Sequence, residues 1–415
     1  MKKFQLIGLL LMLSATVSAQ ETIKAMFYNV LMFPSASPGG RTETLKNIVD
    51  SYDPDIFMIC ELETEAGGIT ILNESLNVEG IEYVMAPFQL NTSSGAVLQQ
   101  LVYFKKGMFT LETVDIIQTN VRDINRYKLL LETADQAVDP VFIDLYVTHL
   151  KSSQGSSNVQ ARLDMVTEFT NSLSNLDPNA FILFAGDLNL YTSSEPAYQE
   201  LLDPSNAITM VDPIDTPGSW NNNVSFQAVH TQSTRINSGP FGAGAGGGMD
   251  DRFDFILMSE NMQTDPKLRY IPDTYKSYGN NGNCYNNDVS STDCTGEFSQ
   301  ELRNYIFSMS DHLPVVMEFE TNKEIVLSVS EATQSVPLMQ LEKTIVSNVL
   351  SIQISEAVAQ PTVLSVYNVF GQRILKFNSL PATMMQIDVS HLAEGIYYLK
   401  SNISNSQPIK FLKVS

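Results

Sequence analysis

Seven short apolar runs, each rich in β-branched and aromatic residues, recur along the first three quarters of this 415-residue chain. Runs of this length and composition are typical of β-strands, several of them buried on both faces. They lie at residues 23–31, 55–62, 97–106, 141–150, 181–190, 252–259 and 312–320. Helical periodicity is rarer, so strands outnumber helices. This imbalance favours packed sheets with helices on the outside over a doubly wound parallel sheet.

Two segments between these runs carry a helical pattern. Residues 41–52 place apolar side chains at i, i+3, i+4 and i+7, and Pro54 is expected to end this helix. A second apolar stripe begins after Ser156 and Ser157, either of which is a candidate N-cap. The polar insert 213–250 predicts a surface loop with substantial freedom.

The N-terminus predicts a secretory signal peptide over residues 1–19. Two lysines precede an apolar run at 6–13, which is shorter than the ~20 residues that span a bilayer, and small residues follow it. No later segment is apolar for long enough to span a membrane, so a soluble, exported chain is expected. The remaining length predicts one large domain over 20–321 and a smaller all-β domain over 322–415.

Charge limits the partners of the large domain. The chain has a net charge of −21, and nearly all of it falls on residues 20–321. A field of this sign repels polyanions unless a basic patch or a bound metal reverses it locally.

The three cysteines predict one disulfide and one buried thiol. Cys284 and Cys294 flank a short polar loop, and in an exported chain one disulfide closing that loop is the economical interpretation. Cys60 lies inside an apolar run and is expected to be a small buried hydrophobe.

Polar side chains recur where the strand-like runs end. A shared location at one cleft would explain this recurrence, because carboxylates and carboxamides suit a hard divalent cation such as Mg²⁺. Period-two geometry would point Asp187 and Asn189 to the same side, although this pair alone is equally typical of a turn or helix cap. The residues concerned are Asn29, Glu61, His149, Asp187, Asn189, Asp254, Asp311 and His312.

These positions, in this order, resemble the endonuclease/exonuclease/phosphatase superfamily, the metal-dependent phosphoesterases that include deoxyribonuclease I. The motifs are "FYNV", "ICELE", "THL", "GDLN", "RFDF" and "SDHLP". The resemblance implies an α/β fold, a four-layer α/β/β/α sandwich of two packed, mainly antiparallel sheets flanked by helices. It also implies a bound Mg²⁺, or Mn²⁺ or Ca²⁺ in its place. Cys60 departs from the Gln that commonly precedes the family's glutamate.

Roles follow by resemblance. Glu61 resembles the metal-binding glutamate, with Asn29 and Asp311 as its metal- or water-binding neighbours. The pair that orients the attacking water and the phosphate corresponds to Asp187 and Asn189.

The two histidines correspond to the proton-transfer groups. His312 resembles the general base, with Asp254 fixing its tautomer. His149 resembles the second histidine, which stabilises charge on the phosphate or protonates the leaving group.

The expected function is a secreted, metal-dependent phosphoester hydrolase, most simply a phosphodiesterase or nuclease acting as a monomer. Nucleic acid ranks first among substrates, followed by a sphingomyelinase-like or small-molecule phosphatase activity. A non-catalytic cell-surface binding protein on the same fold is the alternative from another class. Outside the motifs, Tyr103, Arg126 and Lys128 are candidate phosphate contacts, and Arg252 is a candidate brace for the site. The Gly-rich stretch 242–248 is typical of a flexible linker.

The C-terminal region resembles the sorting domain of type IX secretion cargo in Bacteroidetes. The similarity covers about 325–415 and rests on "VYNVFGQRIL", "IDVSHLAEGIYYLKS" and "PIKFLKVS". It implies the type IX secretion machinery as a partner and a location outside the cell or on its surface. A carbohydrate- or protein-binding β-sandwich is the alternative interpretation.

Overall fold

The computed structural model describes residues 21–80, 82–93, 96–326, 339–354, 362–369, 372–379, 384–401 and 408–415. The expected signal peptide, residues 1–19, lies outside these residues. Two compact units divide the chain between residues 328 and 329, whereas the sequence places the domain boundary between 321 and 322.

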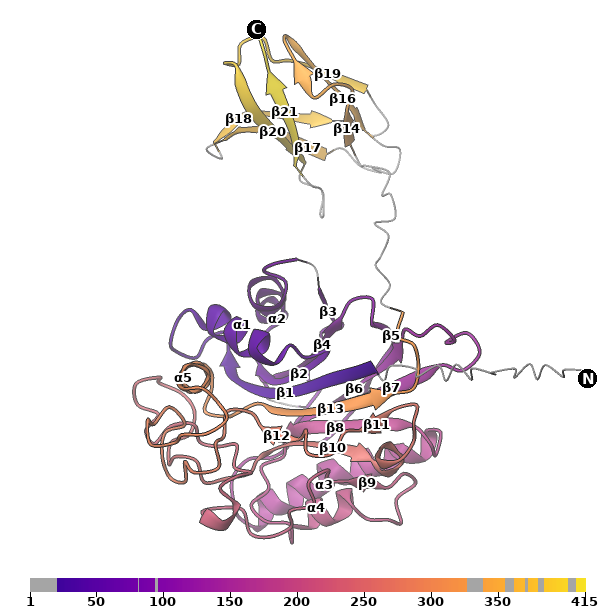
Figure 1. Cartoon of the computed structure of the whole chain (residues 1–415), viewed down its shortest axis with the longest axis vertical. Coiled ribbons are helices and arrows are strands. Elements are labelled where there is room, and N and C mark those ends of the chain that lie inside the picture. Colours follow the sequence, from indigo (N-terminus) through magenta and orange to yellow (C-terminus); the bar gives the residue numbers. More distant parts are fainter. Residues whose placement is uncertain are drawn as a thin grey trace, which may run out of the picture. The chain divides into compact units, whose positions relative to one another are not determined.

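The first unit contains two β-sheets (Figure 1). The strands of the first sheet are β1 (Glu21–Phe33), β2 (Ile56–Leu62), β3 (Tyr83–Met85), β4 (Gln99–Lys105), β11 (Arg269–Tyr270), β12 (Lys276–Ser277) and β13 (Val315–Thr321). Their order is β11-β13-β1-β2-β4-β3, and β12 also pairs with β13.

The second sheet has the order β5-β6-β7-β8-β10-β9. Its strands are β5 (Phe109–Ile117), β6 (Ile124–Leu131), β7 (Val141–His149), β8 (Phe181–Asp187), β9 (Met210–Val211) and β10 (Asp254–Ser259). In the two sheets β1 runs parallel to β2 and β7 runs parallel to β8, while the other described pairs are antiparallel. The expected mainly antiparallel sheets are therefore confirmed.

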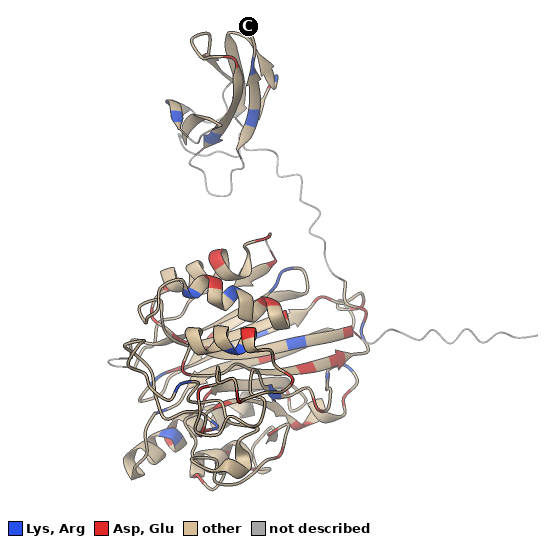
Figure 2. Cartoon of the chain, turned by 60° about the vertical axis from the view of Figure 1, so that its left-hand side comes forward, with Lys and Arg blue, Asp and Glu red and all other residues tan. Residues whose placement is uncertain are grey.

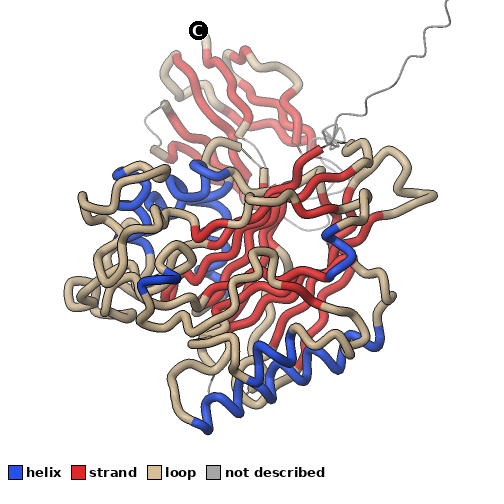
Figure 3. The backbone as a smooth tube through the Cα atoms, turned by 60° about the horizontal axis from the view of Figure 1, so that its bottom comes forward, coloured by secondary structure: helices blue, strands red, loops and turns tan. Residues whose placement is uncertain are grey.

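Alternation along β1 explains the layers. Phe27 packs into the core between the sheets, while its neighbours Met26 and Tyr28 pack toward the helices on the outer face. Figure 3 shows helices on two opposite sides of the strands. The helices are α1 (Arg41–Tyr52), α2 (Glu65–Ile71), α3 (Ser156–Ser172), α4 (Pro196–Leu201) and α5 (Gln300–Met309), with short turns η1 (Leu72–Leu76), η2 (Leu173–Asn175), η3 (Val224–Phe226) and η4 (Glu260–Gln263).

The four-layer α/β/β/α sandwich is thus the observed architecture. Apolar residues of α1 and α5 share a core with the first sheet, and those of α3 and α4 share one with the second. Each sheet therefore buries both faces, which explains why its strands read as nearly continuous apolar runs.

Two expectations about local structure need correction. The N-cap of α3 is Gly155, not Ser156 or Ser157, and it makes no side-chain capping hydrogen bond. Part of the insert 213–250 is packed rather than free, since residues 230–235 are buried apart from a partly exposed Gln232. The backbone of this part of the insert is hydrogen-bonded to the segment before β13, through Thr234 to Asp311 and Leu313 to Thr231. These backbone groups are therefore not solvated, contrary to what the polar composition suggests.

Both cysteine predictions are confirmed. Cys284 and Cys294 form a disulfide, and Cys60 is a free thiol buried in the core between the sheets. Burial raises the pKa of the Cys60 thiol well above its usual value, with the nearby carboxylates of Asp187 and Glu61 adding to the effect, so it stays protonated.

Much of the positive charge of the first unit is internal. Figure 2 shows Lys and Arg on many separate elements of this unit. Five arginines are buried and donate to backbone carbonyls or carboxylates: Arg41, Arg162, Arg235, Arg252 and Arg303. Carboxylates are buried as well, among them Asp144, Asp212 and Asp254, so the surface keeps the acidic balance that the net charge indicates.

In the part of the second unit that the structure describes, strands are the regular elements, as expected. Its strands are β14 (Met339–Leu341), β15 (Ile345–Val346), β16 (Val349–Ile354), β17 (Thr362–Asn368), β18 (Arg373–Ser379), β19 (Met384–Asp388), β20 (Gly395–Ser401) and β21 (Ile409–Lys413). They form the sheets β14-β16-β19 and β15-β21-β20-β17-β18. Buried residues of both sheets, including Leu350, Ile352, Leu364 and Leu399, share one core.

Candidate active site

Strand pairing brings the polar strand ends together. In the second sheet Asp187 ends β8, where it lies opposite His149 of β7 on one side and Asp254 of β10 on the other. In the first sheet Asn29 lies opposite Cys60, one residue before Glu61. Because the two sheets pack face to face, these two sets of strand ends meet at one edge of the sandwich.

Asn29 joins the two sheets. Its buried side-chain amide donates to Glu61 Oε1 at 3.0 Å and to Asp187 Oδ2 at 3.1 Å. Its Oδ1 accepts the backbone N–H of Leu31 at 3.0 Å. Glu61 accepts a second hydrogen bond, from the backbone N–H of Met32, at 3.1 Å. The carboxylates of Glu61 and Asp187, which come from different sheets, are thus both hydrogen-bonded to the Asn29 side-chain amide.

His312 is fixed by Asp254. The distance from Nδ1 of His312 to Oδ2 of Asp254 is 2.7 Å, and both side chains are buried. The other ring nitrogen, Nε2, lies 3.6 Å from Asp187 Oδ2. The carboxylate of Asp254 therefore holds the Nδ1–H tautomer and aims Nε2 at the strand ends.

The second histidine faces the same carboxylates. His149 Nε2 lies 3.5 Å from Asp187 Oδ2 and 3.9 Å from Glu61 Oε1. Its Nδ1 is buried without a hydrogen-bond partner. Arg122 fixes the backbone of this strand end, because its guanidinium donates to the carbonyl of His149 at 2.7 Å and to that of Leu150 at 2.6 Å.

Asn189 occupies a turn rather than a strand. β8 ends at Asp187, and Asn189 has a φ of 50° with its backbone N–H bonded to Asp187 Oδ1 at 3.1 Å. The period-two argument for this pair is therefore wrong, and the turn interpretation describes its backbone. The Asn189 amide donates to the Leu150 carbonyl at 3.4 Å, so it remains beside the end of β7.

Burial and mutual repulsion shift the acidities of the site. Burial raises the pKa of Asp187 and of Asp254, and burial followed by repulsion from Asp311 raises that of Glu61. Burial alone would lower the pKa of His312, but the surrounding carboxylates, Asp254 first, outweigh it and raise that pKa well above its usual value.

His149 shifts in the opposite direction. Burial, then the positive charge of Arg122 and the nearness of His312, lower the pKa of its ring well below the usual value. The pKa shifts of the two histidines are therefore opposite in direction, upward for His312 and downward for His149.

Three contacts of the site carry no recognisable sequence signal. Besides Arg122, the Gln232 amide nitrogen lies 2.6 Å from His312 Nε2 and 3.3 Å from Asp311 Oδ2. The backbone N–H of Ala245 donates to Asp311 Oδ2 at 2.6 Å. All three come from segments that the sequence marks only as loops or inserts, so their partners depend on long-range packing.

Residues proposed as phosphate contacts lie elsewhere. Tyr103 is fully buried and donates to the Gly68 carbonyl at 2.9 Å, so that expectation is wrong. Arg126 pairs with Asp144 and Asp115, and Lys128 lies 4.4 Å from the centre of the Phe142 ring.

Arg252 braces the strand next to the site, as expected. Its guanidinium binds both carboxylate oxygens of Asp212, at 2.8 and 2.9 Å, and does not bond to Asp254.

The donor set fits a divalent cation. Ligand atoms of Glu61, His149 and Asp187 lie within 4.8 Å of one another, as do those of Asp187, Asp254 and His312. Oδ1 of Asp311 is buried with no hydrogen-bond partner, which leaves it available to a cation. Carboxylate oxygens dominate, and they are the ligands that hard cations prefer.

Comparison with known proteins gives a family match for the C-terminal part of the chain and similar solved structures for a larger part of it. Residues 346–414 match the family described as "Secretion system C-terminal sorting domain". None of the curated proteins matches the chain. Among the described residues, no helix has the length and apolarity needed to cross a membrane. The sorting-domain match supports export of the chain.

Three solved structures that are similar to this chain each cover 72% of it. They include D. rerio TDP2 in complex with a single-strand DNA product (15% identity, 99% of that chain, TM-score 0.47) and the human Nocturnin catalytic domain with bound sulfate (14%, 97%, 0.46). An endonuclease/exonuclease/phosphatase family protein from Bacteroides thetaiotaomicron is similar at 14% identity over 98% of its chain, with a TM-score of 0.45. The family match repeats the sorting-domain resemblance stated from the sequence, and one of these solved structures carries the name of the superfamily that the large domain resembles.

Proposed function

We propose that this chain is an exported, divalent-metal-dependent phosphoester hydrolase, with a phosphodiesterase or nuclease activity as the first choice. In this proposal residues 20–321 form the catalytic domain and 322–415 the sorting domain. One observation carries it: two histidines with opposite pKa shifts converge on Asp187, beside Glu61. Strand ends that only stabilised a fold would not need five titratable groups buried together.

The Asp254–His312 pair supplies proton transfer. The imidazole is oriented by the 2.7 Å contact, so Nε2 can take a proton from an attacking water or hold a phosphate oxygen. Asp187 lies 3.6 Å from that nitrogen and can orient the same water through its other oxygen.

His149 acts as a neutral hydrogen-bond donor in this scheme. Its Nε2 faces the carboxylates that surround the reacting phosphate, and its depressed pKa keeps the ring uncharged at neutral pH. Arg122 holds the strand end that carries it, which fixes the position of the ring.

Glu61, Asp311 and Asn29 are the residues assigned to hold the cation. A bound divalent cation would polarise the phosphoryl oxygen and offset charge on the attacking and leaving oxygens, worth several kcal/mol of barrier. Mg²⁺ is the first choice, with Mn²⁺ and Ca²⁺ as alternatives, because the donors are mainly oxygens.

The acidic surface favours short substrates within the proposed class. With much of its arginine buried, the first unit offers little positive charge for long stretches of phosphate backbone. Nucleic acid ends or short oligonucleotides fit this surface better than long duplex. A sphingomyelinase-like or small-molecule phosphatase activity remains the second candidate.

The test is a substrate panel with the full chain. Bis-p-nitrophenyl phosphate, p-nitrophenyl phosphate, plasmid DNA, a short oligonucleotide and sphingomyelin are each offered with Mg²⁺, with Mn²⁺ and with EDTA. Glu61→Gln and His312→Ala are expected to abolish metal-dependent turnover, and His391→Ala, in the second unit, is the matched control. Turnover of none of the five substrates by the wild type would reject the proposal.

A further inference from the structure

The Gly-rich stretch 242–248 belongs to an ordered hairpin. Gly248 N–H donates to the Arg235 carbonyl and Gly247 N–H to the Ile236 carbonyl, both at 2.9 Å. Ser233 N–H returns a bond to the Gly248 carbonyl at 2.8 Å. The expectation of a flexible linker is therefore wrong, because Gly247 and Gly248 are paired to the preceding segment and Ala245 is bonded to Asp311. We call residues 232–250 the clamp hairpin.

The clamp hairpin holds Asp311 at three points. The backbone N–H of Ala245 and the side-chain amide of Gln232 both donate to Oδ2, at 2.6 and 3.3 Å. Thr234 N–H donates to the Asp311 carbonyl at 3.0 Å. These bonds occupy one carboxylate oxygen and leave the buried Oδ1 without a partner. The carboxylate is thereby oriented with one oxygen free.

Gly244 is the point of closest approach. Its φ is +87°, and a Cβ added there would lie 2.9 Å from Cγ of Asp311. Gly242 has a similar φ of +70°, but a Cβ added at that position would meet nothing within 4 Å. Backbone conformation alone thus explains glycine at 242, whereas at 244 the contact with Asp311 also requires it.

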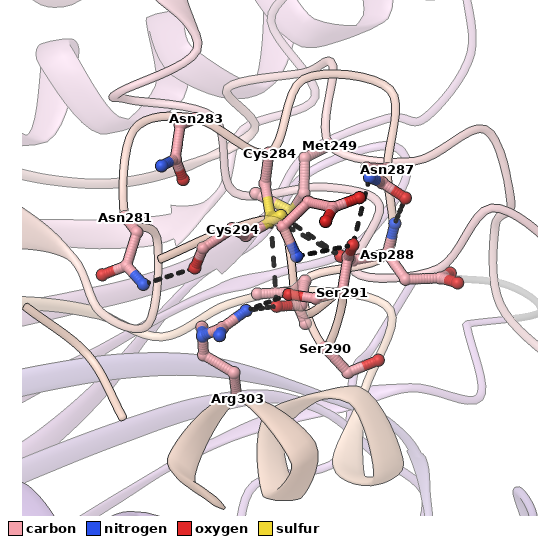
Figure 4. The surroundings of a disulfide bond; sticks show 12 residues. Met249, Asn281, Asn283, Cys284, Asn287, Asp288, Ser290, Ser291, Cys294 and Arg303 are labelled. Atoms are coloured by element: carbon pink, nitrogen blue, oxygen red, sulfur yellow. Dashed lines mark hydrogen bonds between the residues drawn. A yellow bond between two sulfur atoms is a disulfide. The ribbon is translucent and has the colours of Figure 1, made fainter. Parts of the chain in front are cut away.

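The loop closed by the disulfide supports the clamp hairpin from behind (Figure 4). Met249 N–H donates to the Asn287 carbonyl at 3.1 Å, and Val289 N–H donates to the Thr234 carbonyl at 2.9 Å. A Cβ on Gly248 would lie 2.5 Å from the Asn286 carbonyl carbon. The clamp hairpin is therefore held between this loop and Asp311.

We propose that the clamp hairpin is a positioning element that fixes the Asp311 carboxylate for a divalent cation, with Gly244 allowing the close contact. The inference rests on the metal site of the proposed function. A side chain at 244 must displace either the hairpin or the carboxylate, and the carboxylate is the easier to move because it ends a short side chain. The cation would then lose a correctly placed ligand.

The experiment compares Gly244→Ala with Gly242→Ala in the full chain, by calorimetric titration with Mn²⁺. Both variants force alanine into a left-handed conformation, so both are expected to lose stability for the same backbone reason. Only Gly244→Ala should weaken Mn²⁺ binding, by about 10–100-fold. Equal Mn²⁺ affinities for the two variants would overturn the inference.

A second variant guards against misfolding at position 244. Gln232→Leu removes one donor to Asp311 while keeping the side-chain size, and it should also weaken Mn²⁺ binding; an unchanged affinity would count against the clamp. Thermal unfolding in EDTA checks that each variant is folded.

Hydrolysis measured on the same samples separates the two proposals. A wild type that binds Mn²⁺ but hydrolyses nothing rejects the function and leaves the clamp supported if Gly244→Ala binds more weakly. A hydrolysing wild type with an unaffected Gly244→Ala rejects the clamp alone. A wild type without saturable Mn²⁺ binding rejects both.

Discussion

Asp254 and His312 form a buried pair, in which Oδ2 of Asp254 lies 2.7 Å from Nδ1 of His312. Asp254→Asn keeps the shape but removes the charge that fixes the Nδ1–H tautomer. We expect kcat for a phosphodiester substrate to fall about 10²–10⁴-fold with little change in KM, since proton transfer is the step affected. Steady-state kinetics with Asp273→Asn as the exposed control tests this. A variant with wild-type kcat would remove the pair from the mechanism.

Asp251 gives a pH dependence that can be isolated. Burial raises its pKa to about 7, and Asn221 donates to it at 2.8 Å. The ordinary pKa of an aspartate is near 4. At pH values between about 4 and 7 the folded state therefore binds more protons at Asp251 than the unfolded state does, so the contribution of Asp251 to stability falls as pH rises.

Asp251→Asn should therefore be more stable than the wild type at about pH 8, by ~1–2 kcal/mol after allowing for partial exposure, and similar to it at about pH 4. Urea unfolding in EDTA at both pH values measures the difference. Asp293→Asn, at an exposed site, should show no such dependence. A wild-type-like pH profile for Asp251→Asn would mean that the carboxyl is ionised in the folded state.

For individual residues, the sequence predicts which side chains lie together in the site but not which other residues fix their positions. Glu61, His149 and Asp187 could be proposed because each ends an apolar run, and strand ends meet in a packed sheet. Arg122 and Gln232 could not, since their partners are chosen by chain segments far away in sequence.

At the scale of elements, the loop closed by Cys284 and Cys294 is the part most dependent on a covalent link. It has little regular structure of its own, and Arg303 donates to its Val289 and Ser291 carbonyls at 2.7 and 2.8 Å. Replacing both cysteines by serine should cost about 2–4 kcal/mol, mainly by freeing the unfolded chain. Guanidinium unfolding measures this, with Cys60→Ser as a single-thiol comparison.

Elements were predictable where periodicity is strong. The helix at 41–52 and the strand runs follow from apolar spacing, although β8 ends three residues earlier and β10 begins two residues later than expected. The prediction of a free surface loop at 213–250 is partly wrong because polar and glycine-rich composition is typical of free loops. Its burial comes from backbone pairing with the segment before β13, and backbone groups are the same in every residue, so composition cannot reveal it.

At the scale of the whole molecule, each unit has its own core, and unfolding should reflect that. The full chain should show two calorimetric transitions, because each core can melt separately. Ending the chain at residue 328 should remove one transition and leave the other, together with hydrolysis, unchanged. A single transition for the full chain, or loss of the remaining transition on truncation, would mean that the units depend on each other.

The pairing of β13 with β1 joins the last strand of the first unit to its first, from Glu21 opposite Thr321 to Phe27 opposite Val315. A nascent chain on the ribosome therefore leaves one edge of its earliest strand unfilled until some three hundred residues have emerged. His312 arrives with that closing strand. Hydrolytic competence would then appear in one late step of biosynthesis, and fragments released by early termination would be inert.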